Sequence, residues 1–175
     1  VAATGNDGTT NLKSPACASK AVRVASTDKQ DNIADFSNVN LAVDLFAPGE
    51  NIETKTIGGS YSTKSGTSMS APMAAGVAAL VLENETLNPD ELRFRLASTG
   101  KPIEFSEGSV TINISRIDAY NAVINNFTMA PYGYEMNQSN VTNETNITYE
   151  TLGGIYDCGQ GYICFMADDP GVWNF

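Results

Sequence analysis

The chain has 175 residues, 42% of them hydrophobic, which is enough for one domain with a core and a short remnant. Its 20 acidic and 10 basic residues give a formal net charge of −10, which argues against nucleic acid as a partner. No stretch reaches the roughly 18 consecutive apolar residues that a membrane-spanning helix needs.

The first third of the chain predicts short strands joined by polar loops. Residues 1–3 read as the end of a buried strand, and residues 4–18 follow as a loop. Strand candidates at residues 22–25 and 41–43 surround an Asp- and Asn-rich stretch. Residues 51–56 and 60–64 are typical of a hairpin that turns at Gly58-Gly59.

A serine follows this hairpin, between a turn of small residues and a long apolar run. Residues 66–72 read Gly-Thr-Ser-Met-Ser-Ala-Pro, and we expect a helix over residues 67–82 that is apolar all round and therefore buried. A helix N-terminus offers unpaired N–H groups and a partial positive charge. The Ser68 N–H therefore lies where it can face a developing negative charge.

Two further helices and a strand are predicted downstream. Asn88, Pro89 and Glu91 have the spacing of a capped helix start, and this helix continues to about residue 98. Residues 110–114 alternate as a strand does, and residues 117–123 predict a short final helix. We divide the chain into a domain at residues 1–127, an Asn/Thr-rich linker at 128–150 and a Cys-containing remnant of a further module at 151–175.

Several sequence blocks resemble the subtilisin-like serine proteases, or subtilases. Residues 65–80, S-G-T-S-M-S-A-P-M-A-A-G-V-A-A-L, resemble the serine signature of the family, with Met73 where many members have histidine. Residues 1–8, V-A-A-T-G-N-D-G, resemble its A-A-G-N-x-G block. Smaller matches follow in family order at residues 14–16, 36–38 and 44–49. The resemblance implies an α/β fold: the C-terminal part of a three-layer structure with a mostly parallel sheet, followed by an irregular tail.

The same resemblance implies a serine endopeptidase that cleaves peptide or protein substrates through an acyl-enzyme. Ser68 is then the nucleophile, and the amide of Asn6 joins the Ser68 N–H in the oxyanion hole. Ala3, Thr4 and Gly5 would form a wall of the substrate pocket, and Thr67 would assist near the oxyanion. No cofactor is needed for this chemistry. Many subtilases bind structural calcium at variable sites, so calcium is compatible but no ligand is assigned.

The catalytic Asp and His of the family lie upstream of the A-A-G-N block, and this chain contains no histidine. We therefore interpret the chain as a fragment whose partner is the N-terminal part of the catalytic domain, and we expect it to be inactive alone. A half sheet would leave an open edge and an uncovered apolar face.

Two other functions are considered. A non-catalytic binding or structural module derived from a subtilase remains open, and the upstream coding sequence would discriminate. An α/β-hydrolase is disfavoured because Ser68 is followed by Met69-Ser70, without the glycine of the G-x-S-x-G elbow.

Sequons and cysteines indicate a secreted or extracellular protein. Cys158 and Cys164 could close a small disulfide loop in an oxidising compartment. N-glycosylation is expected at the sequons, although an Asn-rich composition alone could produce their clustering. They lie at Asn84, Asn113, Asn126, Asn137, Asn140, Asn143 and Asn146.

Overall fold

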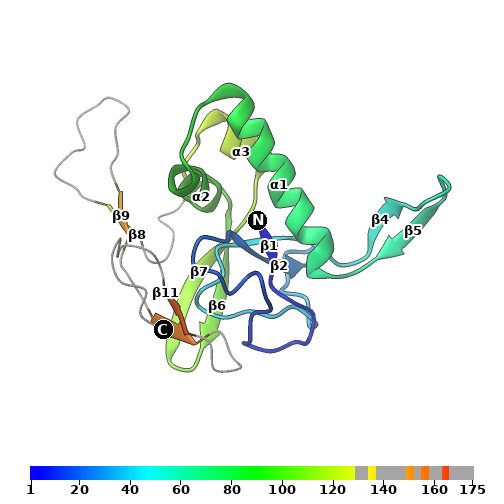
Figure 1. The fold of residues 1–175 in the computed structure, drawn as a ribbon, viewed down its shortest axis with the longest axis horizontal. Coiled ribbons are helices and arrows are strands. Elements are labelled where there is room, and N and C mark those ends of the chain that lie inside the picture. Colours follow the sequence, from blue (N-terminus) through cyan, green and yellow to red (C-terminus); the bar gives the residue numbers. More distant parts are fainter. Residues whose placement is uncertain (129–133, 137–148, 152–154, 158–162, 166–175) are drawn as a thin grey trace.

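A computed structural model describes residues 1–128, 134–136, 149–151, 155–157 and 163–165 (Figure 1). Its centre is a five-stranded sheet in the order β1-β2-β3-β7-β6. The strands are β1 (Ala2–Ala3), β2 (Arg23–Thr27), β3 (Leu45–Pro48), β6 (Lys101–Glu107) and β7 (Val110–Arg116). All pairings are parallel except β6 with β7. The predicted α/β class with a mostly parallel sheet is therefore confirmed.

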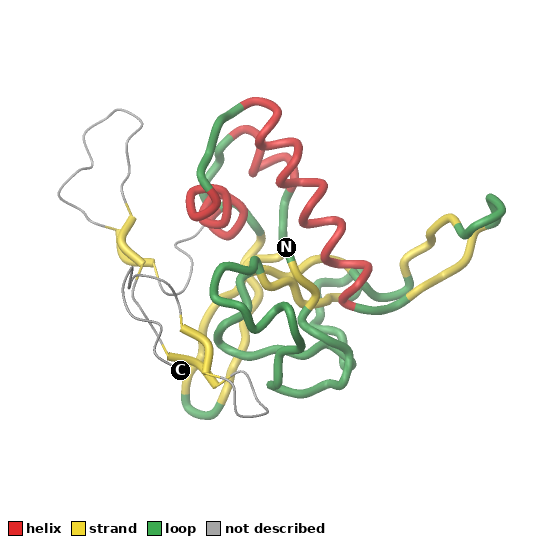
Figure 2. The backbone as a smooth tube through the Cα atoms, in the orientation of Figure 1, coloured by secondary structure: helices red, strands yellow, loops and turns green. Residues whose placement is uncertain are grey.

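Helices cover one face of this sheet, and loops cover the other (Figure 2). The helices are α1 (Thr67–Asn84), α2 (Pro89–Ser98) and α3 (Ala119–Ile124). Val24, Leu45 and Val81 belong to the core beneath the helices. Leu12, Val39 and Phe46 belong to a second core beneath the loops. Among the described residues, loops and not helices cover this second face.

Helix α1 is buried on one face only, which corrects the prediction that it is buried all round. Ala74, Val77, Ala78 and Val81 are buried against the sheet and the other helices. The opposite face is exposed and consists mainly of small or apolar residues. Its members are Pro72, Ala75, Gly76, Ala79, Leu80 and Leu82. The exposed apolar face therefore lies on α1 and not on the sheet, both of whose faces are covered, while β1 forms an edge of the sheet with two residues.

Local signals predicted the turns and caps correctly. The hairpin consists of β4 (Ile52–Lys55) and β5 (Tyr61–Lys64), which pair antiparallel and extend away from the body (Figure 1). Asn88 accepts hydrogen bonds from the Asp90 and Glu91 N–H groups, and Glu91 accepts one from the Asn88 N–H, which completes a capping box.

Two strand assignments differ from the prediction. Residues 41–43 are not a strand, because Asn40 Oδ1 accepts the Ala42 N–H at 2.9 Å and turns the chain before β3 begins at Leu45. Strand β6 was not predicted, although residues 101–107 alternate between exposed and half-buried positions. Its Pro102 is compatible with a strand at the edge of the sheet.

The tail contains strands that the sequence did not predict. β8 (Tyr134–Met136) pairs with β9 (Tyr149–Thr151), and β10 (Ile155–Asp157) pairs with β11 (Ile163–Phe165), both antiparallel. The proposed domain boundaries at residues 127 and 150 stay predictions.

Candidate active site

The turn before α1 is held tightly against the end of β3. Gly66 has φ of 153°, a conformation that L side chains rarely adopt, and its N–H donates to the Gly49 carbonyl at 2.8 Å. A Cβ on Gly49 would lie 2.1 Å from Ser70 Oγ and 2.3 Å from Ser26 Oγ. Only glycine therefore permits this approach. Ser70 Oγ also donates to the Ala47 carbonyl at 3.0 Å, which ties the first turn of α1 to β3.

Ser68 is the second residue of α1, and its side chain is exposed. The first N–H groups of a helix have no acceptor within the helix. Within the described chain, no acceptor outside the helix binds the Ser68 N–H either. This N–H can therefore donate to a ligand beside the Ser68 hydroxyl.

Asn6 is anchored directly to the residue before Ser68. Asn6 Oδ1 accepts hydrogen bonds from the Thr67 N–H at 2.8 Å and from Thr67 Oγ1 at 2.9 Å. Thr67 Oγ1 accepts the Gly5 N–H at 3.2 Å, which closes a small network. With the amide oxygen engaged, Asn6 Nδ2 is left as the donor, and no acceptor for it occurs among the described residues.

Of the four residues predicted to bind substrate, Gly5 and Thr67 lie in this network, and Ala3 and Thr4 directly precede Gly5. Ala3, at the end of β1, and Gly5 are half-buried, whereas Thr4 and Thr67 are buried. The Gly5 N–H binds Thr67, and its carbonyl accepts the Asn38 N–H at 3.0 Å. In this geometry Thr67 positions Asn6, and the Thr67 hydroxyl makes its two hydrogen bonds, to Asn6 and Gly5, inside the protein. Contact with a substrate stays a prediction for all four.

Asn38 organises the loop that carries Asn6, and sequence reasoning did not assign it this role. Its side chain is fully buried, and its Oδ1 accepts the Asp7 N–H at 2.8 Å and the Thr9 N–H at 3.3 Å. Its Nδ2 donates to the Asn11 carbonyl at 2.8 Å. The Phe-Ser-Asn block at residues 36–38 marked this asparagine, but only the fold brings it to the Asn6 loop.

A salt bridge lies on the outer side of the same loop. Lys13 Nζ is 2.9 Å from Asp7 Oδ2, and both side chains are half exposed. The hydrogen bond from Lys13, followed by one from Asn38, lowers the pKa of Asp7 below its usual value. The charge next to Asn6 is therefore balanced locally.

The other predicted sites are only partly described. Asn84, Asn113 and Asn126 are exposed. Asn137, Asn140, Asn143, Asn146 and Cys158 lie outside the described residues, while Cys164 lies in β11, so the disulfide is untested. Among the described residues, no group of His, Cys, Asp and Glu side chains could hold a metal ion. Likewise, none of the described helices is long and apolar enough to cross a membrane.

An exposed serine hydroxyl can attack a carbonyl, and unpaired N–H donors near it can stabilise the resulting oxyanion, provided that a base is supplied. The described chain brings Ser68 and Asn6 together through Thr67 and contains no histidine to act as that base.

Comparisons with known proteins show which family this chain resembles. The subtilase family, Peptidase S8, matches residues 1–148. Halolysin of Haloferax mediterranei is 40% identical over 124 residues, which cover 70% of this chain and 24% of halolysin. The thermophilic serine proteinase of Bacillus sp. strain AK1 is 38% identical over 123 residues, covering 70% of this chain and 30% of the relative. The chain thus spans less than a third of the length of these curated relatives.

Solved structures show the same likeness. A cold adapted subtilisin-like serine proteinase matches with a TM-score of 0.52 and 43% identity, over 56% of this chain and 37% of that one. The patellamide maturation protease matches with a TM-score of 0.60 and 30% identity, over 70% of this chain and 49% of that one. Because the family match extends over residues 1–148, the chain belongs to the subtilase family.

Proposed function

We propose that the complete protein containing this chain is a serine endopeptidase that cleaves peptide bonds with Ser68 as its nucleophile. The observation that carries the proposal is the anchoring of Asn6 Oδ1 by Thr67, which leaves Asn6 Nδ2 and the Ser68 N–H as donors beside an exposed serine hydroxyl. A non-catalytic module has no need for such a pair of outward donors.

In the proposed reaction, Ser68 Oγ attacks the carbonyl carbon of the scissile bond. Its proton passes to a base on a segment outside this chain, and the carbonyl oxygen becomes an oxyanion held by the two N–H donors. The base then protonates the leaving amine as the C–N bond breaks. Water hydrolyses the acyl-enzyme by the reverse sequence of proton transfers. No cofactor takes part, and structural calcium stays a prediction.

The partner of this chain is then the remaining part of the catalytic domain. We propose that it packs on the exposed face of α1, because this face is apolar and lies on the helix that carries Ser68. The chain alone is accordingly inactive. The proposed location is extracellular. This is supported by the 39% identity to the halolysin-like extracellular serine protease Nep of Natrialba magadii and by the exposed sequon asparagines Asn84, Asn113 and Asn126.

The decisive experiment compares the complete protein with its Ser68→Ala variant on an unstructured protein substrate. Wild type should cleave the substrate and be labelled at Ser68 by a serine-reactive phosphonate, whereas Ser68→Ala should lose both properties. Ser65→Ala removes a nearby exposed serine and should keep both. Cleavage that survives Ser68→Ala would sink the nucleophile assignment. A folded wild type without cleavage or labelling would favour the non-catalytic module.

A further inference from the structure

A buried ionic cluster joins three parts of the fold at the start of strands β2 and β3. Arg23 on β2 is fully buried, Arg93 on α2 is 4% exposed, and Asp44 lies between them just before β3. Arg23 Nη1 is 3.4 Å from Asp44 Oδ2, and Arg93 Nε is 3.8 Å from Asp44 Oδ1. Burial raises the pKa of Asp44, and the two guanidinium charges oppose that rise. Burying such charges costs free energy, and further hydrogen bonds to the guanidinium groups offset part of that cost.

Both arginines donate most of their remaining hydrogen bonds to the main chain of residues 13–21, while Arg23 Nη1 also donates to the Ala42 carbonyl at 3.1 Å. Arg23 donates from Nε and Nη2 to the carbonyls of Ala16, Ala18 and Ser19, at 3.1, 3.4 and 3.5 Å. Arg93 donates from Nη2 to the carbonyls of Ser19 and Ala21, both at 3.2 Å. One loop is therefore held along its length by two guanidinium groups that share a single carboxylate.

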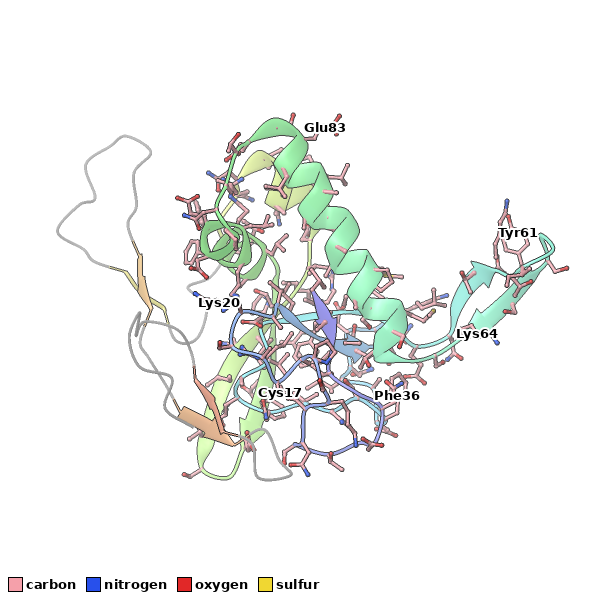
Figure 3. All side chains as sticks on the ribbon, in the orientation of Figure 1. Cys17, Lys20, Phe36, Tyr61, Lys64 and Glu83 are labelled. Atoms are coloured by element: carbon pink, nitrogen blue, oxygen red, sulfur yellow. The ribbon has the colours of Figure 1, made fainter. Side chains whose placement is uncertain are left out.

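This arrangement fixes the loop backbone and leaves side chains outside. Recognition of carbonyl oxygens does not depend on the side chains of the loop. Ser14, Pro15, Ala18 and Lys20 are exposed, and Lys20 lies at the end of the loop that faces α2 (Figure 3), with its Nζ 3.8 Å from Asp90. The loop thus has a rigid main chain and a surface that remains available for contact.

The start of the same loop is fastened to the Asn6 segment. The Lys13 N–H donates to the Thr4 carbonyl at 2.9 Å, and the Lys13 ammonium pairs with Asp7. The contacts of Lys13 and those of the cluster therefore hold the loop at both ends relative to Asn6.

We propose that Arg23, Asp44 and Arg93 are positioning residues that hold residues 13–21 as a substrate-contacting wall beside Asn6. The proposal rests on the protease function proposed above. It predicts an effect on substrate binding without an effect on the chemical step, because none of the three residues reaches Ser68 or Asn6 through a recorded contact.

The test uses Arg93→Met in the complete protein, with Arg95→Met as the matched control. Arg95 lies on the same helix and is 7% exposed, but it binds Glu85 and the Ala122 carbonyl and makes no recorded contact with the loop. Amide hydrogen exchange should become faster in residues 13–21 of Arg93→Met and stay unchanged there in Arg95→Met. KM for a peptide substrate should rise about tenfold in Arg93→Met alone, with kcat within about twofold of wild type, since a mobile wall must be ordered on binding.

Hydrogen exchange decides the positioning role even if the protein cleaves no peptide, so the failure of this proposal is distinct from that of the protease function. Unchanged exchange in the loop of Arg93→Met would overturn it, as would faster exchange with an unchanged KM. An equal rise of KM in Arg95→Met would mean that the rise comes from general destabilisation, and it would overturn the proposal as well. If Arg93→Met does not fold, Arg93→Lys serves instead. It keeps the charge near Asp44, and the same two shifts are expected at smaller size.

Discussion

Asn6 shows how one side chain can be divided between structure and chemistry. Its oxygen is committed to Thr67 by two hydrogen bonds, so the amide cannot rotate without losing both. The Nδ2 group is thereby held in one orientation before any substrate arrives. Preorganised donors of this kind stabilise a transition state because they need no rearrangement during the reaction.

Asn6→Ala in the complete protein should lower kcat while leaving KM nearly unchanged. The expected loss is about 100- to 1,000-fold, a magnitude known for the loss of such a donor in a subtilisin. Steady-state kinetics on a peptide substrate measure both constants. Asn11→Ala, an exposed asparagine in the same loop, should behave as wild type. A kcat of Asn6→Ala within threefold of wild type would remove Asn6 from the oxyanion hole.

Motifs identified the residues of the candidate site better than the residues that support them. Ser68 and Asn6 were identified because each stands in a distinctive run of neighbours in the sequence. Asn38 and Gly49 depend on contacts that only the fold creates: Asn38 bonds a loop some thirty positions earlier, and Gly49 touches Ser26 and Ser70. No local pattern specifies such pairs, so their roles could not be predicted.

At the scale of elements, α1 combines two different surfaces in one apolar run. The sequence predicted the helix and its start correctly, because the Gly-Thr-Ser turn and the apolar residues are local signals. It could not predict that one face would be exposed, because composition alone does not distinguish a face packed inside this chain from one that needs another segment. The wrong strand at residues 41–43 has a related cause, since the Asn40 turn overrides the strand propensity of Leu41 and Val43.

The exposed face of α1 predicts a substitution that is tolerated in this chain alone but harmful in the complete protein. Ala79→Arg should leave the unfolding free energy of this chain alone within about 0.5 kcal/mol, since Ala79 is exposed and arginine is a good helix former. In the complete protein it should prevent folding or activity, because a charge would be buried where the proposed partner segment packs. Urea unfolding of the chain and activity of the complete protein measure the two effects.

Ala119→Arg supplies the control for this comparison, because Ala119 is exposed on α3 and lies outside that face. It should be tolerated in both contexts. Full activity of Ala79→Arg in the complete protein would show that the face of α1 stays open, and the proposed position of the partner would be wrong.

At the scale of the molecule, ionic contacts join the loops to the far edge of the sheet. Asp31, in the loop after β2, accepts Arg116 Nε from β7 and Lys101 Nζ from β6, each at 2.7 Å. Burial alone would raise the pKa of this carboxyl, but the hydrogen bonds from Lys101 and Arg116 outweigh burial and lower it. Ordered motifs spread over the chain made the family membership predictable. The contact of Asp31 with Lys101 and Arg116 was not predictable, because these partners are 70 and 85 residues from Asp31 in the sequence.

The lowered pKa makes this contact a source of acid sensitivity. Because the Asp31 pKa is lower in the folded than in the unfolded chain, ionised Asp31 stabilises the fold above the unfolded value of about 4. That stability is lost as pH falls through the folded pKa. Asp31→Asn should therefore lower the unfolding free energy at pH 7 by about 1 kcal/mol, a value reduced for partial solvent screening. The difference from wild type should shrink towards zero in strong acid, where both side chains are neutral.

Urea unfolding at several pH values measures this difference, with Asp35→Asn as the exposed control in the same loop. A gap between wild type and Asp31→Asn that is the same at neutral and acid pH would mean that the loss comes from packing and not from the charge of Asp31.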